Sequence, residues 1–224
     1  MRIFSKHSLA VRIFHWLNFI LLGIMIWSGL LIYWANDIYR FSFFGHELFH
    51  FFPEWFYNLL NIPFRLAEGM AWHFNFMWLF TLNGLIYVIW ILISGEWKEI
   101  FPNKNSFRDA IFVVLHDLRI RKTKPAQKKY NAAQRLAYTG VIMMAILTIL
   151  SGIAIYKPIQ VQWLANSFGG YAWARWWHFT FTMLFFVFFV IHVVQVIFAG
   201  WNNFRAMVAG FEVIKDKSEK NKPK

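Results

Sequence analysis

Two histidines in the last apolar stretch, His178 and His192, are the residues of this chain best placed to do chemistry. They lie fourteen residues apart. Fourteen residues of α-helix advance about 21 Å and turn the side chain back to within roughly 40° of its first direction. The two imidazoles would therefore share one helix face at two depths. Imidazole is the commonest metal ligand among side chains, and polar groups inside a membrane are usually functional.

Two further histidines, His15 and His73, lie near the starts of other apolar stretches. Four histidines at two depths form two pairs, which is the pattern expected for two bis-histidine haems stacked across a membrane. The chain has no cysteine. This excludes the attachment site of c-type haem and the thiolates of iron–sulfur clusters, so both haems would be haem b.

The elements that carry these histidines follow from the composition, which is 58% hydrophobic, 21% aromatic and 15% charged. Apolar stretches run over roughly 13–34, 72–94, 136–156 and 173–199, and each reaches the ~20 residues that a transmembrane helix needs. The sequence therefore predicts an all-α integral membrane protein built as a four-helix bundle. The first stretch is longer than the apolar part of a signal peptide, and no small-residue cleavage site follows it, so we expect a retained helix.

The net charge of +12 is distributed unevenly along the chain. Of 23 Lys and Arg residues, ten lie in 97–135, three at the N-terminus and six after Trp201. Lys and Arg gather in cytoplasmic loops, so this pattern predicts a multi-pass protein of the bacterial inner membrane with both termini cytoplasmic. We divide it into a transmembrane domain, 1–211, and a basic cytoplasmic tail, 212–224. The charge calls for no nucleic acid partner.

This orientation pairs the histidines by depth. His15 and His192 would lie near the cytoplasmic side, and His73 and His178 near the periplasmic side. A proton or metal transporter that uses the same histidines is the alternative from another functional class. Proton relays usually recruit intramembrane Asp or Glu, and none of the four spans contains either residue.

The chain also contains a faint internal repeat. The nine residues from Trp72 match the nine from Trp177 at six positions, and Ser28-Gly29 is matched by Ser151-Gly152. The first two spans thus resemble a helical hairpin that the last two spans repeat. The copies differ at the other two histidines, since His15 aligns with Tyr138, and His192 with Tyr87.

The connections 35–71 and 97–133 are expected to hold short interfacial helices, because both contain apolar residues mixed with charged ones. The first is rich in Phe and Trp. We expect it, together with 157–172, to form the docking surface for a periplasmic redox subunit.

Three arginines at the starts of spans, Arg12, Arg135 and Arg175, could bind haem propionates, because guanidinium suits carboxylates. Anchoring at the membrane interface explains them equally well. Lys6 and His116 could border a cytoplasmic quinone site. Five glycines could let a flat macrocycle lie against helix backbones, or simply mediate helix packing: Gly23, Gly29, Gly84, Gly140 and Gly152.

Three segments resemble thiosulfate-reductase-type cytochrome b subunits of the bacterial cytochrome b561 superfamily. They are His7-Ser8-Leu9-Ala10-Val11-Arg12-Ile13-Phe14-His15-Trp16-Leu17-Asn18, the stretch from Trp72-His73-Phe74 to Leu82-Asn83-Gly84-Leu85-Ile86-Tyr87, and Tyr130-Asn131-Ala132-Ala133-Gln134-Arg135-Leu136-Ala137-Tyr138. The likeness extends from His7 to about Phe211. The superfamily includes the cytochrome b subunits of Ni–Fe hydrogenase and formate dehydrogenase.

The resemblance implies a four-helix, di-haem electron-transfer subunit linked to a quinone, with its ligands on the first, second and fourth helices. These positions match His15, His73, His178 and His192. The resemblance also implies a periplasmic molybdopterin partner of the sulfite-oxidase type. The cytochrome b of a hydrogenase or formate dehydrogenase is the alternative within the same class.

Overall fold

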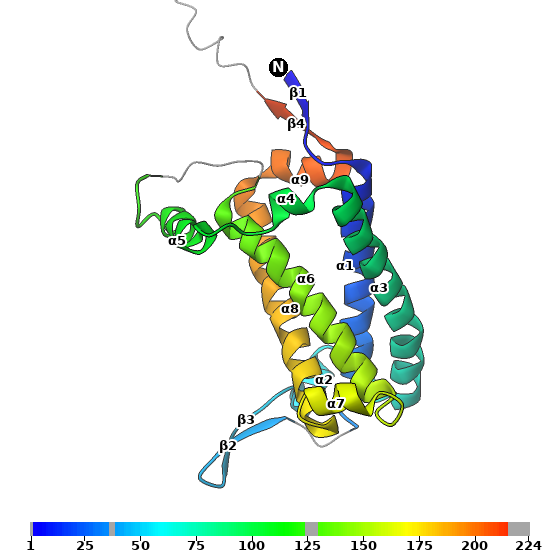
Figure 1. Ribbon diagram of the computed structural model, residues 1–224. Coiled ribbons are helices and arrows are strands. Elements are labelled where there is room, and N and C mark those ends of the chain that lie inside the picture. The colour runs from blue at the N-terminus through cyan, green and yellow to red at the C-terminus, as the bar shows by residue number, and fades with distance from the viewer. Residues whose placement is uncertain (1, 36–38, 124–129, 215–224) are drawn as a thin grey trace, which may run out of the picture. The chain divides into compact units, whose positions relative to one another are not determined.

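Four long helices dominate the computed structural model, which describes residues 2–35, 39–123 and 130–214. They are α1 (Leu9–Tyr33), α3 (Leu66–Ser94), α6 (Ala132–Tyr156) and α8 (Tyr171–Ala199), and each is long and apolar enough to cross a membrane (Figure 1). The four predicted spans are thus confirmed as helices, and all four helices begin a few residues before the apolar stretches.

In the described part of the chain, five short helices occupy the connections and the C-terminal end: α2 (Glu54–Leu59), α4 (Trp97–Ile100), α5 (Ser106–Asp117), α7 (Gln162–Ser167) and α9 (Trp201–Ala209). The two connections expected to hold short helices contain α2 and α4–α5. Their location at the membrane interface stays a prediction.

Two antiparallel strand pairs were not predicted. Strands β2 (Arg40–Phe43) and β3 (His46–His50) form a hairpin whose turn uses the positive φ angles of Phe44 (49°) and Gly45 (77°). Strands β1 (Arg2–Ser5) and β4 (Phe211–Ile214) join the two ends of the described chain (Figure 1). The predicted tail therefore begins as a strand, and its residues 215–224 lie outside the described part.

Residue contacts divide the chain into two compact units. The first comprises Met1–Asn83 and Phe186–Lys224, and the second is Gly84–Phe185. The first unit thus holds α1, the start of α3, the end of α8 and α9. The second holds α6, the start of α8, the end of α3 and the helices α4, α5 and α7.

The two helical hairpins match in length and register. Helices α1 and α6 have 25 residues each, and α3 and α8 have 29 each. Ser28 and Ser151 both lie 19 residues after the first residue of their helices, and His73 and His178 both lie 7 residues after theirs. Two independent helices would rarely agree in all four quantities, so the structure supports the internal repeat.

The two hairpins achieve close packing with different small residues. A Cβ placed on Gly69 of α3 would lie 2.6 Å from Leu31 Cβ and 3.1 Å from the Leu31 carbonyl carbon of α1. In the second hairpin Ala154 and Ala174 are both fully buried in one cluster. Gly69 and Ala174 lie four residues before His73 and His178, so this packing brings each histidine against the neighbouring helix.

We expect Gly69→Ala to destabilise the protein by about 1–3 kcal/mol, because the new methyl group would meet a neighbouring Cβ and backbone that cannot rotate away. Thermal unfolding in detergent measures the effect. Met70→Ala is the matched control, since the next side chain is exposed. Equal stability of the two variants would show that α1 and α3 do not approach each other as closely as described.

Candidate functional site

His73 is held by a hydrogen bond across the first hairpin. Its Nδ1 lies 2.9 Å from Oγ of Ser28, a fully buried serine on α1. The same Oγ lies 3.1 Å from the Met25 carbonyl oxygen, to which it donates. With the hydroxyl proton directed to Met25 O, Oγ accepts from the Nδ1–H of His73.

His178 repeats this arrangement in the second hairpin. Its Nδ1 lies 3.2 Å from Ser151 Oγ and 3.0 Å from the carbonyl oxygen of Thr148. A carbonyl oxygen can only accept, so the proton of His178 is on Nδ1. Ser151 is also fully buried and donates to helix carbonyls, with 2.8 Å to Leu147 O.

The protonated Nδ1 has a direct chemical consequence. It places the lone pair of both imidazoles on Nε2, which is the tautomer that a metal-binding histidine needs. Histidine ligands usually donate their second ring N–H to a protein acceptor, which fixes the ring and raises its basicity. His73 and His178 both have that outer support.

Glycines let the two imidazoles lie against the facing helices. A Cβ on Gly152 would lie 3.2 Å from His178 Cε1, and one on Gly29 would lie 3.8 Å from His73 Cε1. These two glycines were expected as packing positions for a macrocycle or for helices. They contact the imidazole rings themselves.

His15 and His192 come together at the other end of α1 and α8. Their ring centroids are 6.1 Å apart with the planes tilted by 55°. A metal–imidazole bond is about 2 Å long, so this separation admits one iron atom bound to a nitrogen of each ring. His192 stacks on Phe188, and His15 packs edge-on against Trp16. The buried Nδ1 of His15 has no hydrogen-bond partner among the described residues.

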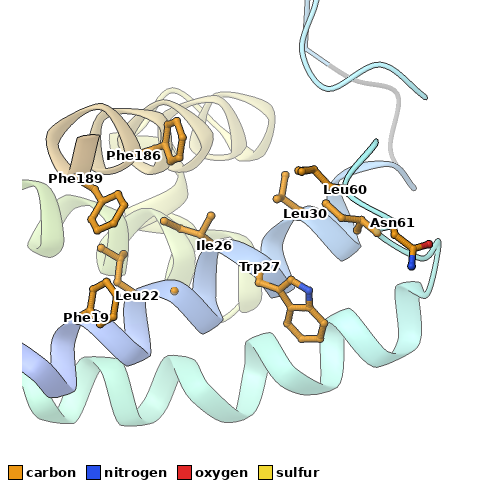
Figure 2. Close-up of a pocket in the computed structure, with 11 residues that line it drawn as sticks. Phe19, Leu22, Ile26, Trp27, Leu30, Leu60, Asn61, Phe186 and Phe189 are labelled. Carbon is orange, nitrogen blue, oxygen red and sulfur yellow. The ribbon is translucent and has the colours of Figure 1, made fainter. Parts of the chain in front are cut away.

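An apolar pocket of about 400 Å³ follows this pair along α1 (Figure 2). Phe19 lies one turn after His15 and stacks on Phe189 of α8 at 6.0 Å. The remaining lining is aliphatic, aromatic or glycine apart from Asn61. The pocket is thus lined by the low-polarity side chains that suit a flat apolar ligand.

The predicted arginines lie as follows. Arg12 Nη1 donates to the Val208 carbonyl oxygen at the end of α9 (2.8 Å). Arg135 Nη2 donates to the carbonyl oxygens of Lys98 (2.9 Å) and Phe101 (2.5 Å), around the end of α4. Both therefore cap the C-terminus of a short helix, where cations are favourable. Propionate binding by Arg12, Arg135 and Arg175 stays a prediction.

The two residues predicted to border a quinone site belong to different units of the chain. Lys6 belongs to the first unit, where it pairs with Glu212, whereas His116 belongs to the second and lies 3.3 Å from Asp117. Within the described part of the chain, no three His, Asp or Glu side chains gather to hold a metal ion. A haem needs only two protein ligands, because the porphyrin nitrogens provide the other four.

Sequence reasoning did not identify the serines as histidine partners, although the Ser-Gly match of the repeat was the available signal. Nor did it give a role to Tyr138 and Tyr87. In the internal repeat Tyr138 aligns with His15, and Tyr87 aligns with His192. These two tyrosines lie within electrostatic range of each other, and Tyr130 packs edge-on against Tyr138 at 5.1 Å. Burial raises the pKa of Tyr130, and the nearby Tyr138 and Glu96 raise it further. The hydroxyl of Tyr130 therefore stays protonated and remains a hydrogen-bond donor.

Known proteins provide two comparisons. The family model described as prokaryotic cytochrome b561 matches residues 6–210. A protein of Azospira oryzae named "Putative protein-methionine-sulfoxide reductase subunit YedZ1" is 32% identical over 195 residues, covering 87% of this chain and 91% of the relative.

We expect Ser28→Ala and Ser151→Ala each to weaken haem binding on the order of 10- to 100-fold, the usual loss when the outer partner of a histidine ligand is removed. Titration of the haem-depleted protein, followed by absorbance, measures it. Ser94→Ala is the control, because the described hydrogen bonds of Ser94 Oγ are to backbone groups, donated to Ile91 O and accepted from Glu96 N, and none is to a histidine. Unchanged affinity in both variants would contradict a ligand role for His73 and His178.

Proposed function

The chain belongs to the prokaryotic cytochrome b561 family, and we propose that this membrane cytochrome b subunit of a redox complex binds two haems b. In this proposal His15 and His192 bind one haem, and His73 and His178 bind the other. The observation that carries it is the chemistry of the four imidazoles. The ring centroids of His15 and His192 lie 6.1 Å apart. His73 and His178 carry their protons on Nδ1, which leaves the lone pair of each ring on Nε2.

When bound, haem supplies one-electron chemistry at its iron. The protein residues determine how that chemistry is tuned. Ser28 and Ser151 hold the tautomer and ring direction of His73 and His178. The α1–α8 pair is held by aromatic packing instead, through Trp16 and Phe188. A ligand with a stronger Nδ1–H hydrogen bond donates more charge to iron, so the two haems would differ in potential.

The electrons would pass between the quinone pool and a redox partner outside the cytoplasm. The Azospira relative supports this choice, because its name assigns it to a protein-methionine-sulfoxide reductase. A periplasmic molybdopterin subunit is the partner we propose. The uneven distribution of Lys and Arg supports an orientation with both termini cytoplasmic.

The β2–β3 hairpin and α2 support a docking role. Exposed aromatic side chains gather there: Phe43, Phe44, Phe49 and Trp55. Phe44 at the turn is 87% exposed. Such apolar area is normally covered, either by the membrane interface or by a protein. We propose that the partner covers it, near the haem of His73 and His178.

Removing ligands should affect the haems in pairs. His15→Ala or His192→Ala should abolish one low-spin haem, and His73→Ala or His178→Ala the other. Pyridine haemochrome assays give the stoichiometry, which should be two per wild-type chain and one in each variant, and electron paramagnetic resonance identifies the haem lost. His50→Ala is the control. A common haem lost in the His15 and His178 variants would refute the pairing, and one haem in the wild type would refute the stoichiometry.

The docking surface can be tested with charged residues. Phe43→Asp combined with Phe49→Asp should weaken binding of the redox subunit severalfold, because carboxylates would have to be desolvated in the interface. Co-purification and a binding titration in detergent measure it. Phe107→Asp on α5, where the phenyl ring is 69% exposed, is the matched control. Binding lost in the control but kept in the hairpin variant would place the partner elsewhere.

A further inference from the structure

The two ends of the described chain are tied together. Strands β1 and β4 pair antiparallel, with Arg2 opposite Ile214 and Ser5 opposite Phe211. The backbone N–H of Lys6 continues the pairing with a 3.0 Å hydrogen bond to Gly210 O. We call β1, Lys6 and residues 210–214 the terminal clasp.

One half-buried lysine provides the charged contacts of the terminal clasp. Lys6 Nζ lies 2.5 Å from Glu212 Oε1 and donates to Asn203 Oδ1 on α9 at 2.8 Å. The side chains of Lys6 and Glu212 are only 31% and 21% exposed. Their ion pair is thus better shielded from water than the pairs of fully exposed residues that contribute little.

The first turns of α1 extend the same connection. Trp16 Nε1 donates to Met207 O at 3.3 Å, and its ring packs edge-on against Phe204. Arg12 caps α9 at Val208 and fits closely over Gly210, where a Cβ would lie 3.1 Å from Arg12 Cζ. Gly210 has φ of 89°, the left-handed conformation that commonly ends a helix.

The terminal clasp and these contacts link α1, which carries His15, to α9, which follows the histidine-bearing end of α8. On one side, Trp16 follows His15 and packs edge-on against its ring at 5.1 Å. On the other side, α9 follows α8 after Gly200, eight residues beyond His192. Among the described residues the buried Nδ1 of His15 has no hydrogen-bond partner, unlike that of His73, so the separation of the two rings depends on how α1 and α8–α9 are held.

We infer that Lys6 and Glu212 are positioning residues for a haem between His15 and His192. The inference rests on the proposed function, because it assigns these residues a role towards that haem. Loss of the ion pair would loosen the terminal clasp, let α1 move relative to α8–α9 and weaken the hold of His15 or His192 on a haem. The haem of His73 and His178 keeps its ligands, because its hydrogen bonds lie within the two hairpins.

The experiment is a charge reversal in the full-length, haem-loaded protein. Lys6→Glu and Glu212→Lys should each raise severalfold the fraction of high-spin, carbon-monoxide-reactive haem at the His15/His192 position. The double variant restores the attraction and should return this fraction towards the wild-type value. The signal of the other haem should not change. Arg40→Glu and Glu47→Arg, which reverse an exposed 3.1 Å ion pair in the β2–β3 hairpin, are the matched controls.

Hydrogen–deuterium exchange of residues 2–6 and 211–214 reports independently whether the terminal clasp has opened. Faster exchange without a change in haem spin state overturns the inference and leaves the proposed function intact. Disturbance of both haems alike overturns it too, because that indicates general destabilisation. If a single variant retains too little haem, Asn203→Ala removes only a neutral contact of Lys6 and should give a smaller change in the same direction. A wild-type protein without a haem at His15 and His192 refutes the proposed function itself.

Discussion

The hydrogen bond from a histidine Nδ1–H to the neighbouring helix is the constraint on which the site depends. In hydrocarbon an unpaired N–H is costly, and no water competes for it. The bond therefore both anchors the helix pair and orients the ring. It also determines the tautomer, since the Thr148 carbonyl oxygen can only accept from His178 and Ser28 Oγ accepts from His73 while its hydroxyl donates to Met25 O. Gly69, Ala174, Gly29 and Gly152 are small because this contact requires adjacent helices to approach closely.

The internal repeat applies this arrangement twice, and the copies diverge where their roles diverge. Each has a serine, a histidine and a stacked aromatic pair four residues apart, Trp72 with Phe76 and Trp177 with Phe181. At the other end of the helices each copy has one histidine and one tyrosine, since the first copy contains His15 and Tyr87 and the second contains Tyr138 and His192. A phenol is a hydrogen-bond donor and a poor substitute for imidazole as a low-spin haem ligand. The repeat thus explains why the histidines number four in the spans although the helices are so alike.

The four helices and the family were predictable because they leave strong local signals in length, hydropathy and short motifs, whereas the ligand role of the four histidines stays a prediction. The strands were not. The pairing of β1 with β4 joins residues more than 200 positions apart, and neither strand has a hydrophobic alternation long enough to recognise. The contacts of Ser28 with His73 and of Ser151 with His178 could not be predicted, because they depend on which faces of the helices pack together. For Arg12 and Arg135, charge at a span end was visible in the sequence, but the acceptor carbonyls of α9 and α4 were not.

The sequence separation of the histidine contacts has a consequence for biosynthesis. The Ser28–His73 contact joins consecutive helices, so it can form once α3 has entered the membrane, and Ser151–His178 forms within the second hairpin in the same way. The partner of His15 is on the last long helix, and the strand that completes the terminal clasp emerges from the ribosome later still. Chains are made from the N-terminus at about 5–20 residues per second, so His192 is synthesised about 9–35 seconds after His15. A prematurely terminated chain would retain one ordered hairpin but never bring His15 and His192 together.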